Sequence, residues 1–339
     1  MSDFGRQIIS WYEANKRVLP WRSTRQAYRI WLSEIILQQT RVNQGLAYYE
    51  RFVNAFPKVQ DLANASEQEV LKLWQGLGYY SRARNLHFAA KQIVNDFNGV
   101  FPSNYKDIKS LKGVGDYTAA AIASFAFQLP HPVVDGNVYR LLSRYFNDDT
   151  AIDTGAGKKV FMQYAEELML ESEIDIYNQA IMEMGALVCT PKKPSCEECP
   201  LNASCAALKS NEVLELPVKS KKLKVTEKYM HYLVLKDEFY LLQKREDKGI
   251  WRNMYEFPLI ETKSAVEGIS EKVEEMGFAL NKELYETKHL LSHQKLHVKF
   301  WSVTQLKEKV SHYIKADSLE EYPIPRVIDR FLEERELYE

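Results

Sequence analysis

The chain has 339 residues, of which 45% are hydrophobic, with 14 glycines and 12 prolines. This composition is typical of a globular protein with room for two domains, and it is too polar for a membrane span. The formal net charge is −1, but residues 1–225 carry 27 basic and 24 acidic side chains, whereas residues 226–339 carry 18 and 22. The weak basic bias of the first part suits a polyanionic partner and equally suits a mixed-charge surface.

Apolar residues recur at three-to-four spacing through residues 1–208, which is typical of successive helices. Proline and glycine turns separate these stretches. The predicted helices are Ile30–Tyr49, Glu67–Leu73, Arg82–Phe97, Tyr117–Phe127, Lys158–Leu170 and Ile176–Val188. We therefore expect an all-α domain over residues 1–208.

Glu34 lies in the first predicted helix with large apolar residues on nearly every side. Such a glutamate either occupies a narrow solvent-facing stripe or is partly desolvated. Desolvation raises the pKa of a carboxyl group and makes it a candidate general acid. The local pattern alone favours the solvated stripe.

The turn Gly113-Val114-Gly115 precedes a helix of small residues. Its two glycines allow the backbone to approach a ligand closely, and the amides that open the next helix point toward an anion. A Gly-x-Gly turn by itself is more often a plain connection between helices. The turn is therefore a candidate phosphate-binding element that needs support from the rest of the chain.

Asp135 lies twenty residues after Gly115, at the point where a new helix is expected to begin. Aspartate is a favoured N-cap residue, so a structural role is sufficient to explain it. A carboxylate held at a helix start near the turn is also suited to catalysis. One residue can serve both purposes.

The four cysteines of the chain all fall within 17 residues, as Cys189-x6-Cys196-x2-Cys199-x5-Cys205. Four thiolates on one loop suit a tetrahedral zinc ion or an iron–sulfur cluster. Disulfides are disfavoured, because residues 1–10 do not form a secretory signal and a cytoplasmic location is expected. Zinc sites usually pair cysteines in two short knuckles, and here there is only one.

Residues 209–227 contain few large apolar side chains and several lysines, which predicts an interdomain linker. Beyond it the pattern changes, and Tyr229–Leu235 and Phe239–Lys244 are predicted to form a hairpin. Another strand is expected over Lys295–Thr304, with helices over Ala265–Met276 and Pro325–Glu334. Residues 228–339 therefore predict a small α+β domain.

The cysteine spacing resembles that of the loop that holds a [4Fe-4S] cluster in the endonuclease III and MutY group of helix-hairpin-helix DNA glycosylases. The resemblance implies that the loop 189–205 of this chain holds such a cluster. The resemblance covers residues 5–208. Its motifs are Leu19-Pro20-Trp21-Arg22, the Glu34 segment, Gly76 to Arg84, the Gly113 turn, the Asp135 segment and the cysteine loop. The run Trp31 to Thr40 closely resembles the active-site helix of MutY-type adenine glycosylases, and this favours a desolvated Glu34.

One position distinguishes the chemistry within this superfamily. Lyase members carry a lysine just after the hairpin, and its amine forms a Schiff base with the sugar. Tyr117 occupies this place here, and a phenol cannot form the imine. The resemblance therefore implies a monofunctional glycosylase that leaves an abasic site.

The resemblance also implies the substrate and the roles of individual residues. The substrate would be double-stranded DNA in which adenine is mispaired with 8-oxoguanine or guanine. Glu34 would protonate N7 of a flipped-out adenine, and Asp135 would stabilise the oxocarbenium ion or bond to it. Tyr117 and Asn137 would orient the reacting groups. The implied adenine pocket is Arg17, Trp21, Arg22 and Glu183, and the implied DNA contacts are Gln39, Thr40, Leu77, Tyr79, Gly113, Val114 and Gly115.

The C-terminal domain of these relatives resembles a Nudix fold and reads the base opposite adenine with a Phe-Ser-His loop. Here Leu291-Ser292-His293 matches two of the three residues, so Ser292 and His293 are implied to contact 8-oxoguanine. Glu274 to Gly277 is similar to the end of a Nudix box. The preceding metal-binding part is missing, so Nudix hydrolase activity is not expected.

Two other functions stay open from the sequence. One is an endonuclease III-like pyrimidine glycosylase and lyase, against which Tyr117 argues. The other is a non-catalytic damage-binding protein that uses the cluster as a redox sensor, against which the presence of both Glu34 and Asp135 argues. The protein is further expected to act as a monomer in the bacterial cytoplasm, without a membrane partner.

Overall fold

The computed structural model describes residues 2–170, 172–220, 225–235, 239–262, 264, 268–306 and 313–335. The chain divides into two compact units, and neither is a continuous stretch of sequence. The first comprises residues 1–64 and 88–222, and the second comprises residues 65–87 and 223–339. The segment 65–87 therefore packs with the C-terminal part of the chain, although it lies within the predicted helical domain. Among the described residues, no helix is both long and apolar enough to cross a membrane.

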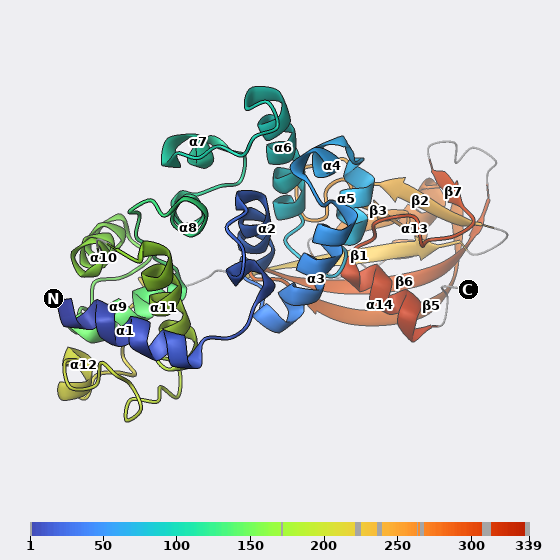
Figure 1. Ribbon diagram of the computed structural model, residues 1–339. Helices are drawn as coiled ribbons and strands as arrows, with labels where there is room; N and C mark the ends of the chain where they lie inside the picture. Colours follow the sequence, from blue (N-terminus) through green and yellow to red (C-terminus); the bar gives the residue numbers. More distant parts are fainter. Residues whose placement is uncertain are drawn as a thin grey trace. The chain divides into compact units, whose positions relative to one another are not determined.

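The first unit is helical (Figure 1). Its elements are α1 (Ser2–Asn15), the 3-10 turn η1 (Pro20–Arg22), α2 (Ala27–Leu37), α3 (Val42–Ala55), α4 (Val59–Asn64), the greater part of α6 (Ser81–Asp96), α7 (Tyr105–Ser110), α8 (Asp116–Phe127), α9 (Gly136–Phe146), α10 (Gly155–Leu168), α11 (Ile174–Leu187) and α12 (Ala206–Lys209). Helix α2 packs against α3 and α8, and α9 packs against α10, α11 and α12.

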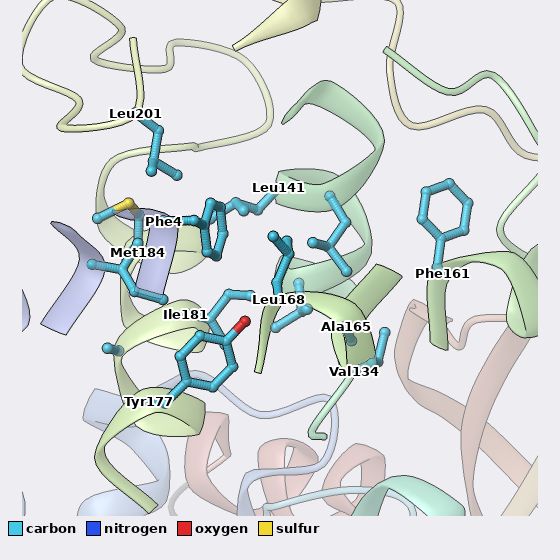
Figure 2. Packing of buried hydrophobic residues seen from close by; sticks show 14 of the residues in the cluster. Phe4, Val134, Leu141, Phe161, Ala165, Leu168, Tyr177, Ile181, Met184 and Leu201 are labelled. Carbon is cyan, nitrogen blue, oxygen red and sulfur yellow. The ribbon is translucent and has the colours of Figure 1, made fainter. Parts of the chain in front are cut away.

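Four helices share a hydrophobic core of this unit, shown in Figure 2. Tyr177, Ile181 and Met184 project from one face of α11, because residues three and four apart lie above one another on a helix. They pack with Phe4 of α1 and Leu141 of α9. This core fixes α11 against the start of α9, and both helices carry predicted site residues.

The predicted helix over Ile30–Tyr49 is wrong as a single helix. The chain forms α2 and α3 with a break between them, and Gln39 in the break has a left-handed φ of 55°. Both helices bury apolar residues, so the apolar spacing continues across the break without a proline or glycine to mark it. The predicted helices over Glu67–Leu73, Arg82–Phe97 and Tyr117–Phe127 are confirmed as α5, α6 and α8, and the last two of the six correspond to α10 and α11.

The second unit combines helices with two sheets. Its elements are α5 (Glu67–Leu73), the start of α6, β1 (Thr226–Val234), β2 (Tyr240–Lys244), β3 (Tyr255–Glu256), β4 (Leu259–Thr262), α13 (Ile269–Glu275), β5 (Phe278–Leu290), β6 (Gln294–Gln305), β7 (Ile314–Ala316) and α14 (Arg326–Glu334). One sheet has the order β4-β1-β6-β5 and the other β3-β2-β7. Helix α14 packs on the first sheet (Figure 1). Phe331 of α14 stacks on Phe300 of β6 with ring centroids 4.0 Å apart.

The predicted hairpin of Tyr229–Leu235 with Phe239–Lys244 is wrong. Strand β1 pairs in parallel with β6 and antiparallel with β4, whereas β2 pairs with β3 and β7 in the other sheet. The predicted strand over Lys295–Thr304 and the helix over Pro325–Glu334 are confirmed as β6 and α14. The predicted helix over Ala265–Met276 is described only from Gly268 onward, where α13 forms.

Part of the predicted linker is held against the first unit. The backbone amide of Ile152 donates to the carbonyl oxygen of Val218 at 3.1 Å, and Arg144 Nε donates to that of Leu216 at 3.1 Å. Leu216 is buried. Residues 216–218 therefore pack as part of the helical unit, and β1 already begins at Thr226.

Candidate active site

A cavity of about 1330 Å3 opens in the helical unit between α2, α8, α9 and α11. Twelve of the predicted site residues line it, namely Arg17, Trp21, Arg22, Glu34, Gln39, Thr40, Gly113, Gly115, Tyr117, Asp135, Asn137 and Glu183. These residues come from segments spread over more than 160 positions of the chain. The fold thus brings both predicted catalytic carboxylates into one cavity.

Glu34 is almost entirely buried, with 8% of its surface exposed, near the end of α2. Burial raises the pKa of its carboxyl to about 7; a hydrogen bond from Tyr117 opposes this rise, and the nearby charge of Asp135 adds to it. A carboxyl with this pKa is substantially protonated at neutral pH. It can therefore deliver a proton inside the cavity.

Asp135 caps the first turn of α9. Its Oδ1 accepts hydrogen bonds from the backbone amides of Asn137 and Val138, each at 2.8 Å, and its Oδ2 accepts one from Asn137 Nδ2 at 2.7 Å. Burial raises the pKa of Asp135, while these hydrogen bonds favour the charged form and lower it. The residue is thus both a helix cap and a fixed carboxylate in the cavity.

The buried side chain of Asn178 holds the segment before Asp135 in place. Asn178 of α11 donates to the carbonyl oxygen of His131 at 3.0 Å and to Ser124 Oγ at 2.9 Å, and its Oδ1 accepts from the amide of Val133 at 3.1 Å. Asn178 is fully buried, so these bonds form without competition from water. The extended segment before Asp135 is thereby fixed to α8 and α11.

Arg140 connects the start of α9 with the end of α11. Its Nη2 donates to Asn137 Oδ1 at 3.0 Å and to the carbonyl oxygen of Gly185 at 2.6 Å. Its Nε donates to the carbonyl oxygen of Cys189 at 2.7 Å. The cysteine loop is thus joined to the side chain that supports Asp135. Residue-by-residue inspection of the sequence missed Arg140, although its position three residues after Asn137 on a helix is compatible with this contact.

Glu183 forms ion pairs with two arginines of the predicted adenine pocket. It is 1% exposed and accepts hydrogen bonds from Arg17 Nε at 2.8 Å and from Arg22 Nη1 at 2.9 Å. Burial would raise the pKa of Glu183, but the hydrogen bonds from both arginines prevail and lower it to about 2. Trp21 is buried, lines the same cavity and packs edge-on against Tyr49. The ion pairs hold the guanidinium groups of Arg17 and Arg22 and the carboxylate of Glu183 together in the cavity.

The break after α2 and the glycine turn lie at the edges of the same cavity. Gln39 adopts its left-handed conformation there, and Gly113 has a φ of 81°. A Cβ added to Gly115 would meet no atom within 4 Å, so the backbone is open on this side and a ligand can approach it. Val114 is buried and does not line the cavity.

Leu77, Tyr79, Ser292 and His293 do not line this cavity. They border a second one, of about 1310 Å3, in the second unit. There the Tyr79 and Ser292 hydroxyls form a hydrogen bond with each other. Tyr79 is 44% exposed, whereas Leu77 is buried. Tyr79, a predicted DNA contact, and Ser292, a predicted 8-oxoguanine contact, are therefore in direct contact.

The four cysteines lie on the loop between α11 and α12, and all are partly buried. Burial raises the pKa of Cys199 to about 11, and the charges of the other three thiolates add to the rise. A cationic metal group among the sulfurs would offset this repulsion and favour the thiolates. No three His, Cys, Asp or Glu side chains in the described residues are grouped for a single metal ion. An iron–sulfur cube binds each of its four cysteines through a separate iron, which agrees with the four partly buried cysteines of this loop.

Comparisons with known families support each part of the chain. Residues 32–168 match the HhH-GPD superfamily of base excision DNA repair proteins, and residues 229–334 match the NUDIX domain. Residues 189–205 match the iron–sulfur binding domain of endonuclease III. The adenine DNA glycosylase of Buchnera aphidicola subsp. Schizaphis graminum is 33% identical over 344 residues, which cover 97% of this chain and 98% of the relative. The chain belongs to the adenine DNA glycosylase family.

The adenine DNA glycosylase of Mus musculus is 43% identical over 213 residues, covering 60% of this chain and 41% of the mouse protein. Among solved structures, a thermostable thymine-DNA glycosylase is 30% identical with a TM-score of 0.57, over 61% of this chain and 95% of the other. An endonuclease III in a DNA complex shares the fold with a TM-score of 0.53.

The chain is thus a DNA N-glycosylase of base excision repair with the two-part fold that the sequence predicted. Its cofactor is a [4Fe-4S] cluster, and the residues that would hold it are Cys189, Cys196, Cys199 and Cys205. Arg144 Nη1 donates to Cys189 Sγ at 3.3 Å. Hydrogen bonds to cluster sulfurs are one means by which a protein adjusts such a group.

Proposed function

We propose that the enzyme is a monofunctional glycosylase that excises adenine mispaired with 8-oxoguanine or guanine in double-stranded DNA. The observation that carries the proposal is that the buried Glu34 carboxyl has a pKa of about 7 and lines the same cavity as Asp135. Adenine leaves readily only after protonation, and N7 is the site that Glu34 would protonate. The protonated carboxyl supplies this proton without a cofactor.

Departure of adenine leaves a positively charged sugar. Asp135 would stabilise this oxocarbenium ion or bond to its anomeric carbon, as one of two carboxylates does in retaining glycosidases. Asn137 would hold Asp135 through its 2.7 Å hydrogen bond, and Tyr117 would hold Glu34. Since Tyr117 stands where lyases have an amine, no imine can form and the strand would stay intact.

The remaining residues would bind the substrate. Arg17, Trp21, Arg22 and Glu183 would form the pocket for the flipped adenine, which presents planar donors and acceptors to planar side chains. Gln39 and Tyr79 would enter the opened base stack with Thr40 and Leu77 nearby, and the turn Gly113-Val114-Gly115 would bind phosphate. Ser292 and His293 would contact 8-oxoguanine. Leu291 stands where the relatives' Phe-Ser-His loop has phenylalanine, so this position offers no aromatic side chain to stack on the base. We propose that the enzyme acts as a monomer.

The test is base release from four duplexes that carry adenine opposite 8-oxoguanine, guanine, cytosine or thymine. We expect rapid release in the first two and no strand cleavage until alkali is added. Borohydride trapping of a protein–DNA adduct in the wild-type enzyme would instead support the lyase function. Equal release from all four duplexes would refute partner recognition.

A further inference from the structure

The turn between α5 and α6 holds an unusual backbone. Gly76, Gly78 and Tyr79 have φ values of 90°, 76° and 47°. Glycine adopts such values freely, but a bulky residue does so only when its surroundings enforce it. Tyr79 is therefore held in its conformation by neighbouring groups.

Arg82, three residues later, supplies several of these contacts. Its backbone amide donates to the carbonyl oxygen of Tyr79 at 2.9 Å. Its Nη2 donates to the carbonyl oxygen of Gly78 at 3.2 Å and lies 3.4 Å from that of Leu77. Trp74 Nε1 donates to the same Gly78 oxygen at 3.0 Å. The guanidinium thus gathers the carbonyls of the turn.

The same guanidinium contacts two aromatic rings. Its central carbon lies 4.9 Å from the ring centroid of Trp74 and 5.8 Å from that of Tyr79. Arg82 is buried, and cations near aromatic faces are attracted more strongly when they are shielded from water. A planar guanidinium can stack on rings and donate in its own plane at once, which an ammonium cannot do.

We propose that Arg82 is a positioning residue for mispair opening: it fixes the Tyr79 ring in the orientation needed for insertion before DNA binds. The inference rests on the proposed insertion of Tyr79 into the base stack. Arg82 acts through the turn and through the ring. The Tyr79 hydroxyl is fixed separately by Ser292, so ring orientation has two independent supports.

The inference is tested with Arg82→Lys, Tyr79→Ala and the double variant. Single-turnover excision is measured on a duplex with adenine opposite 8-oxoguanine and on one with adenine opposite an abasic site, where no partner base must be parted. For Arg82→Lys we expect the ratio of the two rates to fall roughly tenfold, because the charge remains while the planar contacts are lost. The double variant should lose no more than Tyr79→Ala alone, since Arg82 acts through the ring.

The outcomes separate the inference from the proposed function. If Tyr79→Ala leaves the ratio of rates unchanged, the insertion role of Tyr79 fails, and the inference fails with it. If Tyr79→Ala lowers the ratio but Arg82→Lys does not, or the two losses add in the double variant, only the inference is overturned. An equal loss for Arg82→Lys on both duplexes also overturns it, because that result indicates a general structural role. Tyr79→Phe keeps the ring and removes the bond to Ser292, so it is the matched control. In the Tyr79→Phe background, Arg82→Lys should still lower the ratio of the two rates.

Discussion

Arg140 fixes the orientation of the Asn137 amide. Its Nη2 donates to Oδ1 of Asn137 at 3.0 Å, so the amide nitrogen must face Asp135, to which it donates at 2.7 Å. A rotated amide would place a donor against a donor and an acceptor against a carboxylate. Arg140 also donates to the carbonyl oxygen of Cys189. The orientation of the Asn137 amide beside Asp135, the proposed catalytic carboxylate, therefore depends on a side chain that is bound to the cysteine loop.

For Arg140→Met we expect single-turnover adenine release to slow by roughly 10- to 100-fold, the usual effect of removing a partner that orients a functional side chain. Duplex binding should change little. Arg330→Met is the control, because Arg330 is an exposed residue of α14 paired with Glu334. A variant of Arg140 with the wild-type rate would show that Asn137 needs no support.

Glu34→Gln should abolish adenine release and leave duplex binding intact. In the wild type, release should decline as pH rises above about 7, because the carboxyl then loses the proton it donates. Rates measured from pH 5.5 to 9 would check this. A rate independent of pH up to 9 would contradict a general acid with this pKa.

The same substitution should affect stability with a defined sign. The folded protein holds the Glu34 proton to about pH 7, and the unfolded chain releases it near 4.5, so folding is penalised as pH rises through this window. Glu34→Gln should thus gain stability over the wild type, by at most roughly 3 kcal/mol at pH 8 and by little at pH 4.5. Thermal melts at both pH values would show whether the difference has this direction.

Arg22→Gln should weaken the proposed adenine pocket and the fold together. The pKa of Glu183 is about 2 in the folded protein, so its ion pairs stabilise the fold above pH 4.5 and fail as pH falls toward 2. With Arg17 still present, we expect a loss of about 2 kcal/mol at pH 7. Denaturant melts would measure it, together with a rise in the substrate concentration needed for half-maximal rate. Lys16→Gln, which breaks an exposed pair with Glu13, should lose almost nothing.

Gly185→Ala tests the contact between α11 and α9. An added Cβ would lie 2.8 Å from both Cβ and the carbonyl oxygen of Asn137. We expect a loss of roughly 1–3 kcal/mol of stability and a slower rate, because Asn137 must move. In Gly155→Ala the new Cβ meets no atom within 4 Å, so this control should melt at or above the wild-type temperature. Similar melting temperatures for both variants would argue against the close contact.

Cys199→Ser should reduce the iron content below four per chain and weaken the absorption at about 400 nm that arises from thiolate-to-iron charge transfer. Because Leu201 of the same loop packs in the core of the first unit, we also expect a lower melting temperature. Iron analysis and the absorption spectrum measure the two effects. A colourless wild-type protein with one zinc per chain would contradict the cluster.

The sequence identified residue types well where local pattern or motif carried the information. The cysteine spacing, the cap at Asp135 and most of the helices required no long-range knowledge. The desolvation of Glu34 depends on α8 and α9, which lie some 80 and 100 positions away in the chain. For this reason the apolar pattern alone favoured the wrong environment, and only the motif corrected it.

The errors have a similar physical origin. An alternating pattern indicates that β1 and β2 are strands, but it does not identify their partners, and the parallel neighbour of β1 is β6, more than sixty residues later. The break between α2 and α3 falls at Gln39, a residue with no special preference for a left-handed conformation. Arg140 and Asn178 went unnoticed because buried hydrogen-bonding partners have no sequence signature of their own.

The division of the chain constrains how its parts can be exchanged. Gln68 and Gln75 bond to residues beyond 250, namely Tyr255 and Asp329, although in sequence they lie between two groups of residues that line the cavity of the helical unit. The chain passes between the two units three times, after residues 64, 87 and 222. A chimera joined only at residue 222 would therefore combine residues 65–87 of one parent with a foreign C-terminal part. A working exchange must transfer both segments together, so the proposed recognition of the base opposite adenine cannot be replaced by a single crossover.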